Sequence, residues 1–465
     1  MMLEVSFWEI FIKKKIGFRY GVVLGGLEGR NGFSHRDPRA DMEMRYLENM
    51  EENQREVVFK RYQVSQEIQK TVRTIIDNVR EQGDDALRRY ALEFDKIEVK
   101  EIDITQEAEK AYEAIDEELK LAIKKAAENI EAFHKRQVRE DWVGNFDGRE
   151  MGQRFRPINK IGVYVPGGTA AYPSSVLMAI IPAKVAGVEH IAVVTPPAEK
   201  LNQVTLAAAY ISGADKIYAA GGAQGIAALA YGTQTIDPVD KIIGPGNQWV
   251  AVAKKEIRND VEIEFIAGIS EILIIADLTA DPRIVAADLI AQAEHDGNVA
   301  ALVVTDSEEL SKGIIEEVKV QTELLGRRDI INQTLDNAYS GIILVKSMEI
   351  AAEFAEEYAS EHLSIQTSEE NEKMLLEKIS SAGSIFVGRD TPVAAGDYAS
   401  GTNHILPTNQ GSRVTGGVSV DTFTKVSTIQ RLDKTALGKI RKIITTIARS
   451  EGLDGHAESI ERRFD

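Results

Sequence analysis

The chain of 465 residues is long enough for two or three domains, and a hydrophobic content of 43% is ample for their cores. A formal net charge of -18 opposes binding to nucleic-acid phosphates and anionic lipids, and no apolar run reaches the roughly eighteen residues of a membrane helix. We therefore expect a cytoplasmic protein with no nucleic-acid or membrane partner, and the absence of cysteine leaves only nitrogen and oxygen ligands for a metal.

The first 41 residues differ in character from the rest of the chain. An apolar and aromatic run from Phe7 to Ile12 is followed by a basic cluster, Lys13 to Lys15. A secretory signal would need an unbroken apolar core and a cleavage site of small residues, and neither is present. We interpret residues 1–41 as an atypical N-terminal extension that is either disordered or upstream of a true start at Met42 or Met44.

Residues 42–163 are expected to be mainly helical. Apolar residues recur at helical spacing over residues 66–94, which predicts two helices there. Residues 105–140 continue in the same way and are dense in Glu, Lys and Ala, with Ile130 and Phe133 marking the inward face. We interpret the charged residues as a solvated helix face and expect His134 at the surface.

Short apolar runs and helical stretches alternate after residue 160. We expect strands at residues 161–165, 191–194, 216–219 and 241–243, and helices near 175–187, 202–212, 223–231 and 248–257. Such alternation predicts right-handed βαβ units, and hence a parallel sheet with helices on both faces.

Two glycine-rich turns in this block each open a helix. They are Gly221 to Gly225 and Gly244 to Asn247, and both follow expected strands. Turns of this kind bring backbone N–H groups and a helix N-terminus to an anion, which suits a dinucleotide. Neither turn is G-x-G-x-x-G and no Walker A pattern occurs, so simple tight turns are the alternative reading.

A second α/β block follows residue 270. Strands are expected at residues 271–276, 301–305, 342–346 and 384–387, and a helix that starts at Asp281 and Pro282 should run to His295. Beyond Thr408 the chain contains a glycine-rich link, a short run from Val418 to Phe423 and a helix over about residues 437–450.

The segment from Ala394 to Thr408 has neither helical nor strand periodicity. It contains one carboxylate, Asp397, one imidazole, His404, and several small polar residues, and it directly follows the last expected strand. Rigid elements that deliver polar loops often carry binding sites, so we interpret it as a binding loop. The alternative is an ordinary surface loop with satisfied polar groups.

Gln292 and His295 stand three residues apart on one expected helix. Their side chains therefore share a face, with Cβ atoms roughly 5–6 Å apart, and could bind one ion together. Asp397 and a further imidazole would complete a nitrogen and oxygen set suited to Zn²⁺, with Mn²⁺ as the alternative metal. The competing interpretation is a helix-end histidine stabilised by the helix dipole.

Glu361 and His362 form a second candidate group. A carboxylate beside an imidazole offers two proton acceptors with different pKa values, which suits a reaction with two proton transfers. Both can address one cleft only if the backbone turns, and a helix that ends near Tyr358 would provide the turn. The alternative is a helix C-terminus with a solvated acid and a nearby histidine.

Taken together, these motifs resemble the histidinol dehydrogenase family from about Thr71 to His456. Six separate segments in the right order carry the resemblance: Gly162 to Gly168, Gly221 to Leu229, Gly244 to Asn247, Gln292 to His295, Glu361 to Leu363, and the loop from Gly396 to Thr408. The resemblance implies oxidation of L-histidinol through L-histidinaldehyde to L-histidine, with reduction of two NAD⁺, as the last steps of histidine biosynthesis.

The resemblance also implies roles for individual residues. One Zn²⁺ per subunit would be bound by Gln292, His295, Asp397 and His456. The residues implied to contact substrate are Ser270, Gln292, His295, His362, Asp397, His404, Glu451 and His456, and those implied to contact NAD⁺ are Tyr164, Gln224 and Asn247. His362 resembles the base that takes the alcohol proton and later the gem-diol proton, and Glu361 resembles the base that activates water for hydration of the aldehyde.

The fold implied is α/β and aldehyde-dehydrogenase-like, with two Rossmann-like lobes that contain parallel sheets, a helical N-terminal region and a small C-terminal tail domain. Residues 42–163 would form the helical N-terminal part of lobe 1, residues 164–270 an inserted lobe 2 on the NAD side, and residues 271–415 the remainder of lobe 1, with the metal and catalytic residues. Residues 416–465 would be a tail exchanged between the subunits of a homodimer with shared active sites.

One position departs from the family pattern. Ile269 precedes Ser270 where the family usually has proline, which weakens the placement of Ser270. Two alternatives to the histidinol enzyme are a related zinc and NAD dehydrogenase of another small polyol or sulfonated alcohol, and a catalytically silent homologue that binds NAD or metal.

Overall fold

The computed structural model describes residues 42–60, 66–167, 171–266 and 268–465. All described residues belong to one compact unit. The interpretation of residues 1–41 as an extension, and Gly168 of the first glycine motif, lie outside the described residues. Within the described ranges, no helix has both the length and the apolar character needed to cross a membrane.

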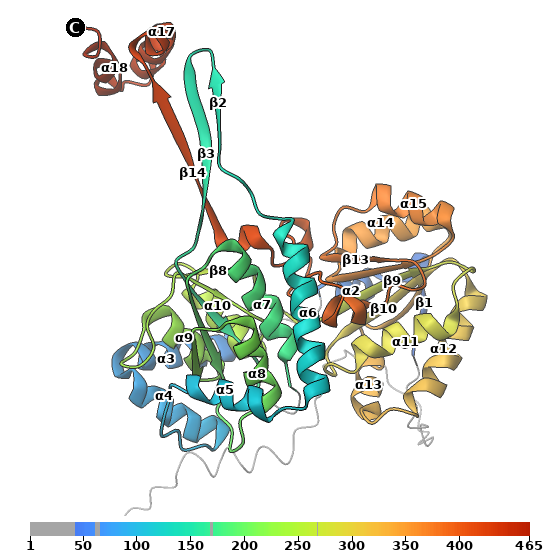
Figure 1. Cartoon of the computed structure of the whole chain (residues 1–465). Helices are drawn as coiled ribbons and strands as arrows, with labels where there is room; N and C mark the ends of the chain where they lie inside the picture. Colours follow the sequence, from blue (N-terminus) through green and yellow to red (C-terminus); the bar gives the residue numbers. More distant parts are fainter. Residues whose placement is uncertain (1–41, 61–65, 168–170, 267) are drawn as a thin grey trace, which may run out of the picture. The chain divides into compact units, whose positions relative to one another are not determined.

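The first parallel sheet has five strands in the order β6-β5-β4-β7-β8 (Figure 1). Its strands and the helices between them confirm the elements expected from the alternating pattern. The strands are β4 (Lys160–Tyr164), β5 (His190–Thr195), β6 (Lys216–Ala219), β7 (Lys241–Ile243) and β8 (Glu262–Ile263). The helices are α7 (Pro173–Ala186), α8 (Gln203–Ser212), α9 (Gly222–Tyr231) and α10 (Gln248–Ile257).

The N-terminal helices also pack on this five-stranded sheet. They are α3 (Gln66–Gln82), α4 (Asp84–Tyr90), the π-helical turn η2 (Ala91–Asp95), α5 (Thr105–Ala114) and α6 (Glu117–Lys135). Apolar residues of α3 and α4 share a core with α9 and α10, whereas those of α5 and α6 share a core with α7 and α8. The structure thus corrects the expected division of the chain, because most of residues 42–163 joins the lobe of residues 164–270.

The position of His134 on α6 is a second correction. We expected a surface residue, but the imidazole is fully buried and its Nδ1 lies 2.8 Å from the carbonyl oxygen of Ile130, one turn earlier. Its neighbour Phe133 is exposed, so Ile130 lies on the inward face and Phe133 does not. Burial favours the neutral imidazole and lowers the pKa of His134.

The second parallel sheet has six strands in the order β1-β11-β10-β9-β12-β13. Its strands are β1 (Met44–Tyr46), β9 (Glu271–Ala276), β10 (Ala300–Thr305), β11 (Gly341–Leu344), β12 (His362–Gln366) and β13 (Ser384–Val387). The four strands expected in this block are confirmed, and β1 joins them at the edge by pairing with β11.

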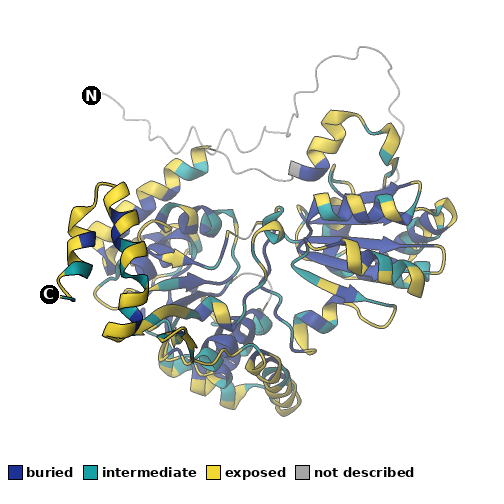
Figure 2. Cartoon of the chain, turned by 90° about the horizontal axis from the view of Figure 1, so that it is seen from above, coloured by how far each residue is buried: buried dark blue, intermediate teal, exposed yellow. Residues whose placement is uncertain are grey.

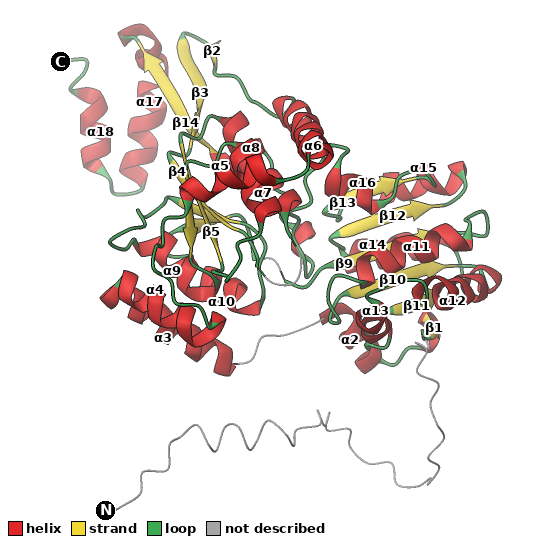
Figure 3. Ribbon diagram, turned by 60° about the horizontal axis from the view of Figure 1, so that its bottom comes forward, coloured by secondary structure: helices red, strands yellow, loops and turns green. Residues whose placement is uncertain are grey.

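Alternate residues of this sheet enter two different cores. Ile272 and Ile274 of β9 pack with α11 (Pro282–Ala293), α12 (Glu308–Thr322) and α13 (Arg328–Leu335). Leu273 and Ile275 pack with α2 (Glu52–Lys60), α14 (Met348–Tyr358) and α15 (Glu369–Lys378) on the other face (Figure 3). Strands buried on both faces read as continuous apolar runs, which explains why the sequence revealed them. Figure 2 shows these strands buried between helices whose outer surfaces are exposed.

A third sheet is antiparallel and was not expected. The hairpin of β2 (Trp142–Phe146) and β3 (Arg149–Pro157) pairs along β3 with β14 (Thr424–Leu432), which lies nearly 270 residues later. The run from Val418 to Phe423 ends in a 3₁₀ turn, η4 (Val420–Phe423), whose N-terminal end is closed by a capping box between Ser419 and Thr422. After β14 come α17 (Lys434–Ser450) and α18 (Asp454–Glu461), which pack on each other.

The loop from Ala394 to Thr408 begins as a helix. The short α16 (Val393–Tyr398) contains Asp397, so the expectation of a segment without helical structure is wrong for its first five residues. The rest of the segment has no regular structure, as expected. Two turns are too short for a periodicity to be read from sequence, especially with a glycine inside them.

Candidate active site

The register between β9 and β12 brings Glu271 beside Glu361 and His362. His362 pairs with Ile272, and α14 ends at Tyr358 as expected, after which Ala359 adopts a left-handed conformation with φ of 50°. This turn carries the chain from the helix into the strand within three residues. Glu361 and His362 are both buried at the start of β12.

The main chain of Glu271 holds both of these side chains. Its N–H donates to Oε2 of Glu361 at 2.7 Å, and its carbonyl oxygen lies 3.0 Å from Nδ1 of His362. A carbonyl oxygen can only accept, so Nδ1 carries the proton in this contact, and Nε2 bears the lone pair of the neutral ring. Among the described residues, the buried Nε2 has no hydrogen-bond partner.

Two more predicted site residues lie next to this pair. Oδ1 of Asp397 is 3.8 Å from Nε2 of His362 and 3.8 Å from Nδ1 of His404, so both contacts are longer than a hydrogen bond. The ring of His404 is held instead by the carbonyl oxygen of Asp397, 3.0 Å from its Nδ1. Asp397, His362, His404 and Glu361 therefore form one cluster.

The two imidazoles of this cluster respond to their surroundings in opposite directions. Burial lowers the pKa of His362, but the carboxylates of Glu361 and Asp397 outweigh burial and raise it to about 9. Burial dominates at His404, whose pKa is lowered in spite of Asp397. One ring is thus disposed to gain a proton and the other to remain neutral.

The segment that carries Asp397 and His404 is fastened to α6. Nδ2 of Asn129 donates to the carbonyl oxygen of Ala399 at 2.7 Å, and a Cβ on Gly401 would come within 2.5 Å of the carbonyl oxygen of Asn129. Asn403 is buried and donates to the carbonyl oxygen of Met178 on α7 at 2.7 Å. Helices α6 and α7, which pack in the five-stranded lobe, thus hold in place the segment that carries Asp397 and His404.

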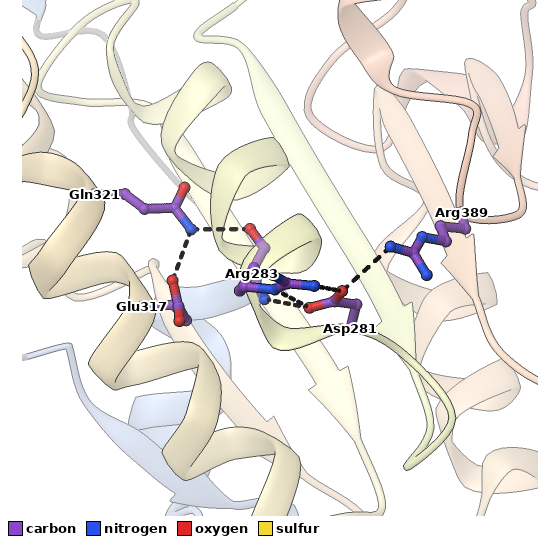
Figure 4. A network of polar contacts seen from close by, with 5 residues as sticks. All are labelled: Asp281, Arg283, Glu317, Gln321 and Arg389. Carbon is purple, nitrogen blue, oxygen red and sulfur yellow. Dashed lines mark hydrogen bonds and ion pairs between the residues drawn. The ribbon is translucent and has the colours of Figure 1, made fainter.

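Gln292 and His295 lie at the C-terminal end of α11. Gln292 is buried in the last turn, whereas His295 is exposed just beyond the helix and is joined to Gln292 by a backbone hydrogen bond of 3.2 Å. At the other end of α11, Asp281 caps the helix by accepting from the N–H of Arg283 at 3.0 Å. The side chains of Arg283 and Arg389 both contact the Asp281 carboxylate (Figure 4).

This ionic contact links the two segments that carry predicted metal ligands. Arg389 follows β13 and precedes α16, which holds Asp397, while Asp281 begins the helix that holds Gln292. The arginine side chains lower the pKa of Asp281 to about 2, so the carboxylate stays charged at neutral pH.

The four predicted metal ligands do not meet within one chain. Among the described residues, no group of three His, Asp or Glu side chains is arranged to hold a metal ion. His456 lies on α18 in the tail, and Glu451 follows α17; both side chains are exposed. The tail is joined to the rest of the described chain through β14, which pairs with β3 (Figure 1).

The three predicted NAD contacts share one edge of the five-stranded sheet. Tyr164 ends β4, and its buried hydroxyl accepts from the N–H of Gly222 at 3.1 Å. Gln224 is buried in the first turn of α9, and Asn247 caps α10 by accepting from the backbone N–H groups of residues 249 and 250. These positions follow the carboxyl ends of the strands, where open parallel sheets bind ligands. Burial raises the pKa of Tyr164 to about 12, so this phenol remains protonated.

Ser270 and Glu271 lie where β9 begins. Ser270 is partly exposed, and Thr408 at the end of the polar loop accepts from the N–H of Gly268 nearby. Sequence reasoning missed Glu271, which is almost fully buried and whose Oε1 accepts from the N–H of Asn409 at 2.7 Å. A lone acidic residue at the start of an apolar strand was the available signal.

The comparisons with known proteins agree with one another. A family model described as histidinol dehydrogenase matches residues 59–464. A protein named histidinol dehydrogenase from Haloarcula marismortui is 55% identical over 424 residues, which cover 91% of this chain and 100% of that protein. One of the same name from Clostridium acetobutylicum is 48% identical over 402 residues, 86% of this chain and 93% of its own length. The crystal structure of histidinol dehydrogenase from Elizabethkingia anophelis superposes with a TM-score of 0.87 at 37% identity, covering 93% of this chain and 99% of that one.

Proposed function

Because the chain belongs to the histidinol dehydrogenase family, we propose that it oxidises L-histidinol through L-histidinaldehyde to L-histidine with reduction of two NAD⁺. The chain is an enzyme of histidine biosynthesis, and members of its family use NAD and zinc. The single observation that best supports the proposed chemistry is the pair of buried acceptors, Glu361 and His362, that the main chain of Glu271 holds side by side.

His362 is the proposed base of both oxidations. The raised pKa of His362, about 9, makes its neutral ring a stronger proton acceptor than a free imidazole; because Nδ1–H is donated to the Glu271 carbonyl oxygen, the neutral ring accepts the substrate proton at Nε2. NAD⁺, when bound, accepts the hydride from the carbon that bears the hydroxyl. In the first oxidation His362 takes the alcohol proton, and in the second it takes the proton of the gem-diol, so each step removes one hydride and one proton.

Glu361 is the proposed base for hydration of the aldehyde between the two oxidations. Its Oε2 is fixed by the Glu271 N–H, so the carboxylate has one orientation in a buried site. A carboxylate in that orientation can take a proton from the water that adds to the aldehyde carbon. A base separate from His362 suits the hydration step, because His362 carries the proton taken in the first oxidation when water adds to the aldehyde.

Gln292, His295, Asp397 and His456 are the proposed ligands of Zn²⁺. An amide oxygen, two imidazole nitrogens and a carboxylate are ligands that Zn²⁺ accepts, and Oδ1 of Asp397 lies 3.8 Å from the rings of His362 and His404, too far for a hydrogen bond to either. Bound Zn²⁺ supplies a Lewis acid that can hold the amine and imidazole of histidinol. His404, Ser270 and Glu451 are the further proposed substrate contacts.

A homodimer with exchanged tails is the proposed assembly. His456 and Glu451 are exposed on the tail, and among the described residues of one chain no three His, Asp or Glu side chains are grouped to hold a metal ion. The tail also exposes large apolar side chains, namely Val426, Ile443, Ile447 and Leu453. Exposed apolar residues gathered in one region of a protein are typical of an interface, and a second copy of the chain would also bring the missing ligand.

An absorbance assay at 340 nm tests the proposed function. Metal-replete enzyme with saturating L-histidinol should reduce two NAD⁺ for each histidinol consumed, lose activity with a chelator and regain it with Zn²⁺. No turnover under these conditions would refute the assignment and favour a silent homologue. Turnover of another small alcohol in preference to histidinol would favour a related dehydrogenase.

A further inference from the structure

Lys254 and Glu264 form an ion pair in the interior of the five-stranded lobe. Nζ of Lys254 on α10 lies 2.6 Å from Oε1 of Glu264, which follows β8, and their side chains are 2% and 0% exposed. The second carboxylate oxygen, Oε2, has no hydrogen-bond partner among the described residues. Burying two charges costs several kcal/mol unless further bonds compensate, so such a pair often serves a purpose other than stability.

Both members of the pair bind the same glycine. Nζ of Lys254 donates to the carbonyl oxygen of Gly244 at 3.0 Å, and the N–H of Gly244 donates to Oε1 of Glu264 at 2.9 Å. The peptide groups on the two sides of Gly244 are therefore held by opposite charges. Hydrogen bonds to charged groups are roughly twice as strong as neutral ones, so the orientation of this residue is strongly fixed.

Gly244 has a backbone conformation that requires this support. Its φ is 113°, a value that residues with a side chain rarely adopt, and a Cβ there would lie 2.1 Å from the carbonyl oxygen of Tyr164. The glycine thus packs against the end of β4 at the residue proposed to contact NAD⁺. A glycine has more freedom than any other residue in the absence of bonds, so the ion pair removes that freedom.

The turn that Gly244 opens leads directly to another proposed NAD contact. Residues 244–247 connect β7 to α10, and Asn247 caps the helix with its Oδ1 3.0 Å from the N–H of Trp249. Lys254 is on the same helix, so its bond to Gly244 ties the start of the turn to the element that ends it. The path of these four residues decides where the N-terminal N–H groups of α10 point.

We propose that Lys254 and Glu264 are positioning residues for NAD⁺, which hold the turn from Gly244 to Asn247 in its binding geometry. The inference rests on the proposed function, because it takes this edge of the sheet as the dinucleotide site. Neither side chain is expected to contact the cofactor, because both act through the backbone of Gly244. A role confined to lobe stability would predict no selective effect on NAD⁺ affinity.

The test separates positioning from stability with a double variant. A single substitution leaves one buried charge unpaired and destabilises the lobe. Lys254→Met combined with Glu264→Leu removes both charges at similar volume, so its melting temperature should stay within a few degrees of wild type. Its KM for NAD⁺ should nevertheless rise about tenfold or more, while zinc content and the KM for L-histidinol stay within about twofold. A stable double variant with an unchanged KM for NAD⁺ would overturn the inference.

Three further variants complete the experiment. Lys255→Met removes the exposed neighbouring lysine of α10 and should leave every parameter unchanged. Glu264→Asp keeps the charge but shortens its reach to the Gly244 N–H, so it should raise the KM for NAD⁺ several-fold. This variant still tests the inference if the double variant does not fold. An unchanged KM for NAD⁺ in folded Glu264→Asp also overturns the inference. Asn247→Ala tests the proposed function itself. If Asn247→Ala leaves the KM for NAD⁺ unchanged, the NAD site is misplaced. If Asn247→Ala raises this KM but the variants of Lys254 and Glu264 do not, only the positioning role is contradicted.

Discussion

The N–H of Glu271 donates to Oε2 of Glu361 at 2.7 Å, and the same residue accepts, through its carbonyl oxygen, from the ring of His362. The two candidate bases at the start of β12 are thus oriented by the N–H and carbonyl groups of one residue, Glu271, on the neighbouring strand β9. Since the support comes from backbone atoms, replacing either base leaves the support of the other intact. Their roles can therefore be separated by single substitutions.

Replacing Glu361 with glutamine should impair the second oxidation selectively. The amide keeps an oxygen that accepts from the Glu271 N–H but cannot accept a proton from water. Aldehyde oxidation should fall by about 10²-fold or more, while NADH formation from histidinol in the first step stays near wild type. Single-turnover kinetics with L-histidinol and with L-histidinaldehyde measure the two steps. Glu357→Gln on the exposed face of α14 is the control, and wild-type aldehyde oxidation by the Glu361 variant would contradict the assigned role.

Replacing His362 with asparagine should suppress both oxidations by about 10²- to 10⁴-fold, the usual contribution of a general base. Asparagine retains a donor for the Glu271 carbonyl oxygen, so the strand pairing should survive. The same single-turnover kinetics measure both steps, with His190→Asn as the control because that histidine is exposed at the start of β5. A variant that still oxidises histidinol at the wild-type rate would show that another group takes the proton.

Subunit mixing should reveal whether the tails are exchanged. Asp397→Asn and His456→Ala should each lose zinc and activity as homodimers. If His456 of the partner subunit completes each site, a mixed dimer has one intact site and one doubly altered site. Mixing equal amounts after dissociation should then restore about one quarter of wild-type activity and zinc content. Mixtures that remain inactive and metal-free, while the two proteins are shown to form mixed dimers, would rule out exchange.

Replacing Asn403 with alanine should raise the KM for L-histidinol more than the KM for NAD⁺. Its Nδ2 donates to the carbonyl oxygen of Met178, and the next residue in the chain is His404. Asn403→Ala leaves a buried carbonyl oxygen unpaired, at a cost of about 1–3 kcal/mol, and frees the loop that carries His404. The KM for L-histidinol should rise several-fold with little change for NAD⁺. Asn159→Ala, at an exposed position, is the control, and equal changes for both substrates would indicate a general loss of structure.

Glu356 should stabilise the protein in a pH-dependent manner. Burial alone would raise the pKa of Glu356, but hydrogen bonds from the hydroxyl and N–H groups of Ser380 and Ser381 lower it to about 2. The folded pKa is below the unfolded one, so the contribution is complete above about pH 4.5 and is lost as the pH falls towards 2.

Urea unfolding checks this expectation. Because the carboxylate is partly exposed, Glu356→Gln should lower the free energy of unfolding at pH 7 by only about 1–2 kcal/mol, and the difference should shrink towards zero near pH 2 to 3. Glu353→Gln, which is exposed on the same helix, should change it by less than about 0.5 kcal/mol. An effect of Glu356→Gln that does not vary with pH would mean that the charge is not the stabilising feature.

Patterns among neighbouring residues predicted the strands of the two parallel sheets and the starts of the helices that follow glycine turns. The strands of both parallel sheets are buried on two faces and read as short apolar runs, as Glu271–Ala276 does, and the glycine turns marked where helices α9 and α10 begin. The strand Trp142–Phe146 and its partners were missed because their side chains are largely exposed on both faces, so apolar and polar residues do not alternate along them. Pairing of Arg149–Pro157 with Thr424–Leu432 gives no local pattern at all.

The sequence by itself determined the α/β class, the order of the βα units and the residue types of the site, because periodicity and motif spacing are properties of neighbouring residues. Only the tertiary structure decided that the N-terminal helices join the five-stranded sheet, that His134 is buried, and that Glu271 orients Glu361 and His362. It alone also brought Lys254 and Glu264 to the same glycine. Such contacts join residues distant in the chain, and their energy depends on burial. Burial of a side chain cannot be read from its neighbours in the sequence.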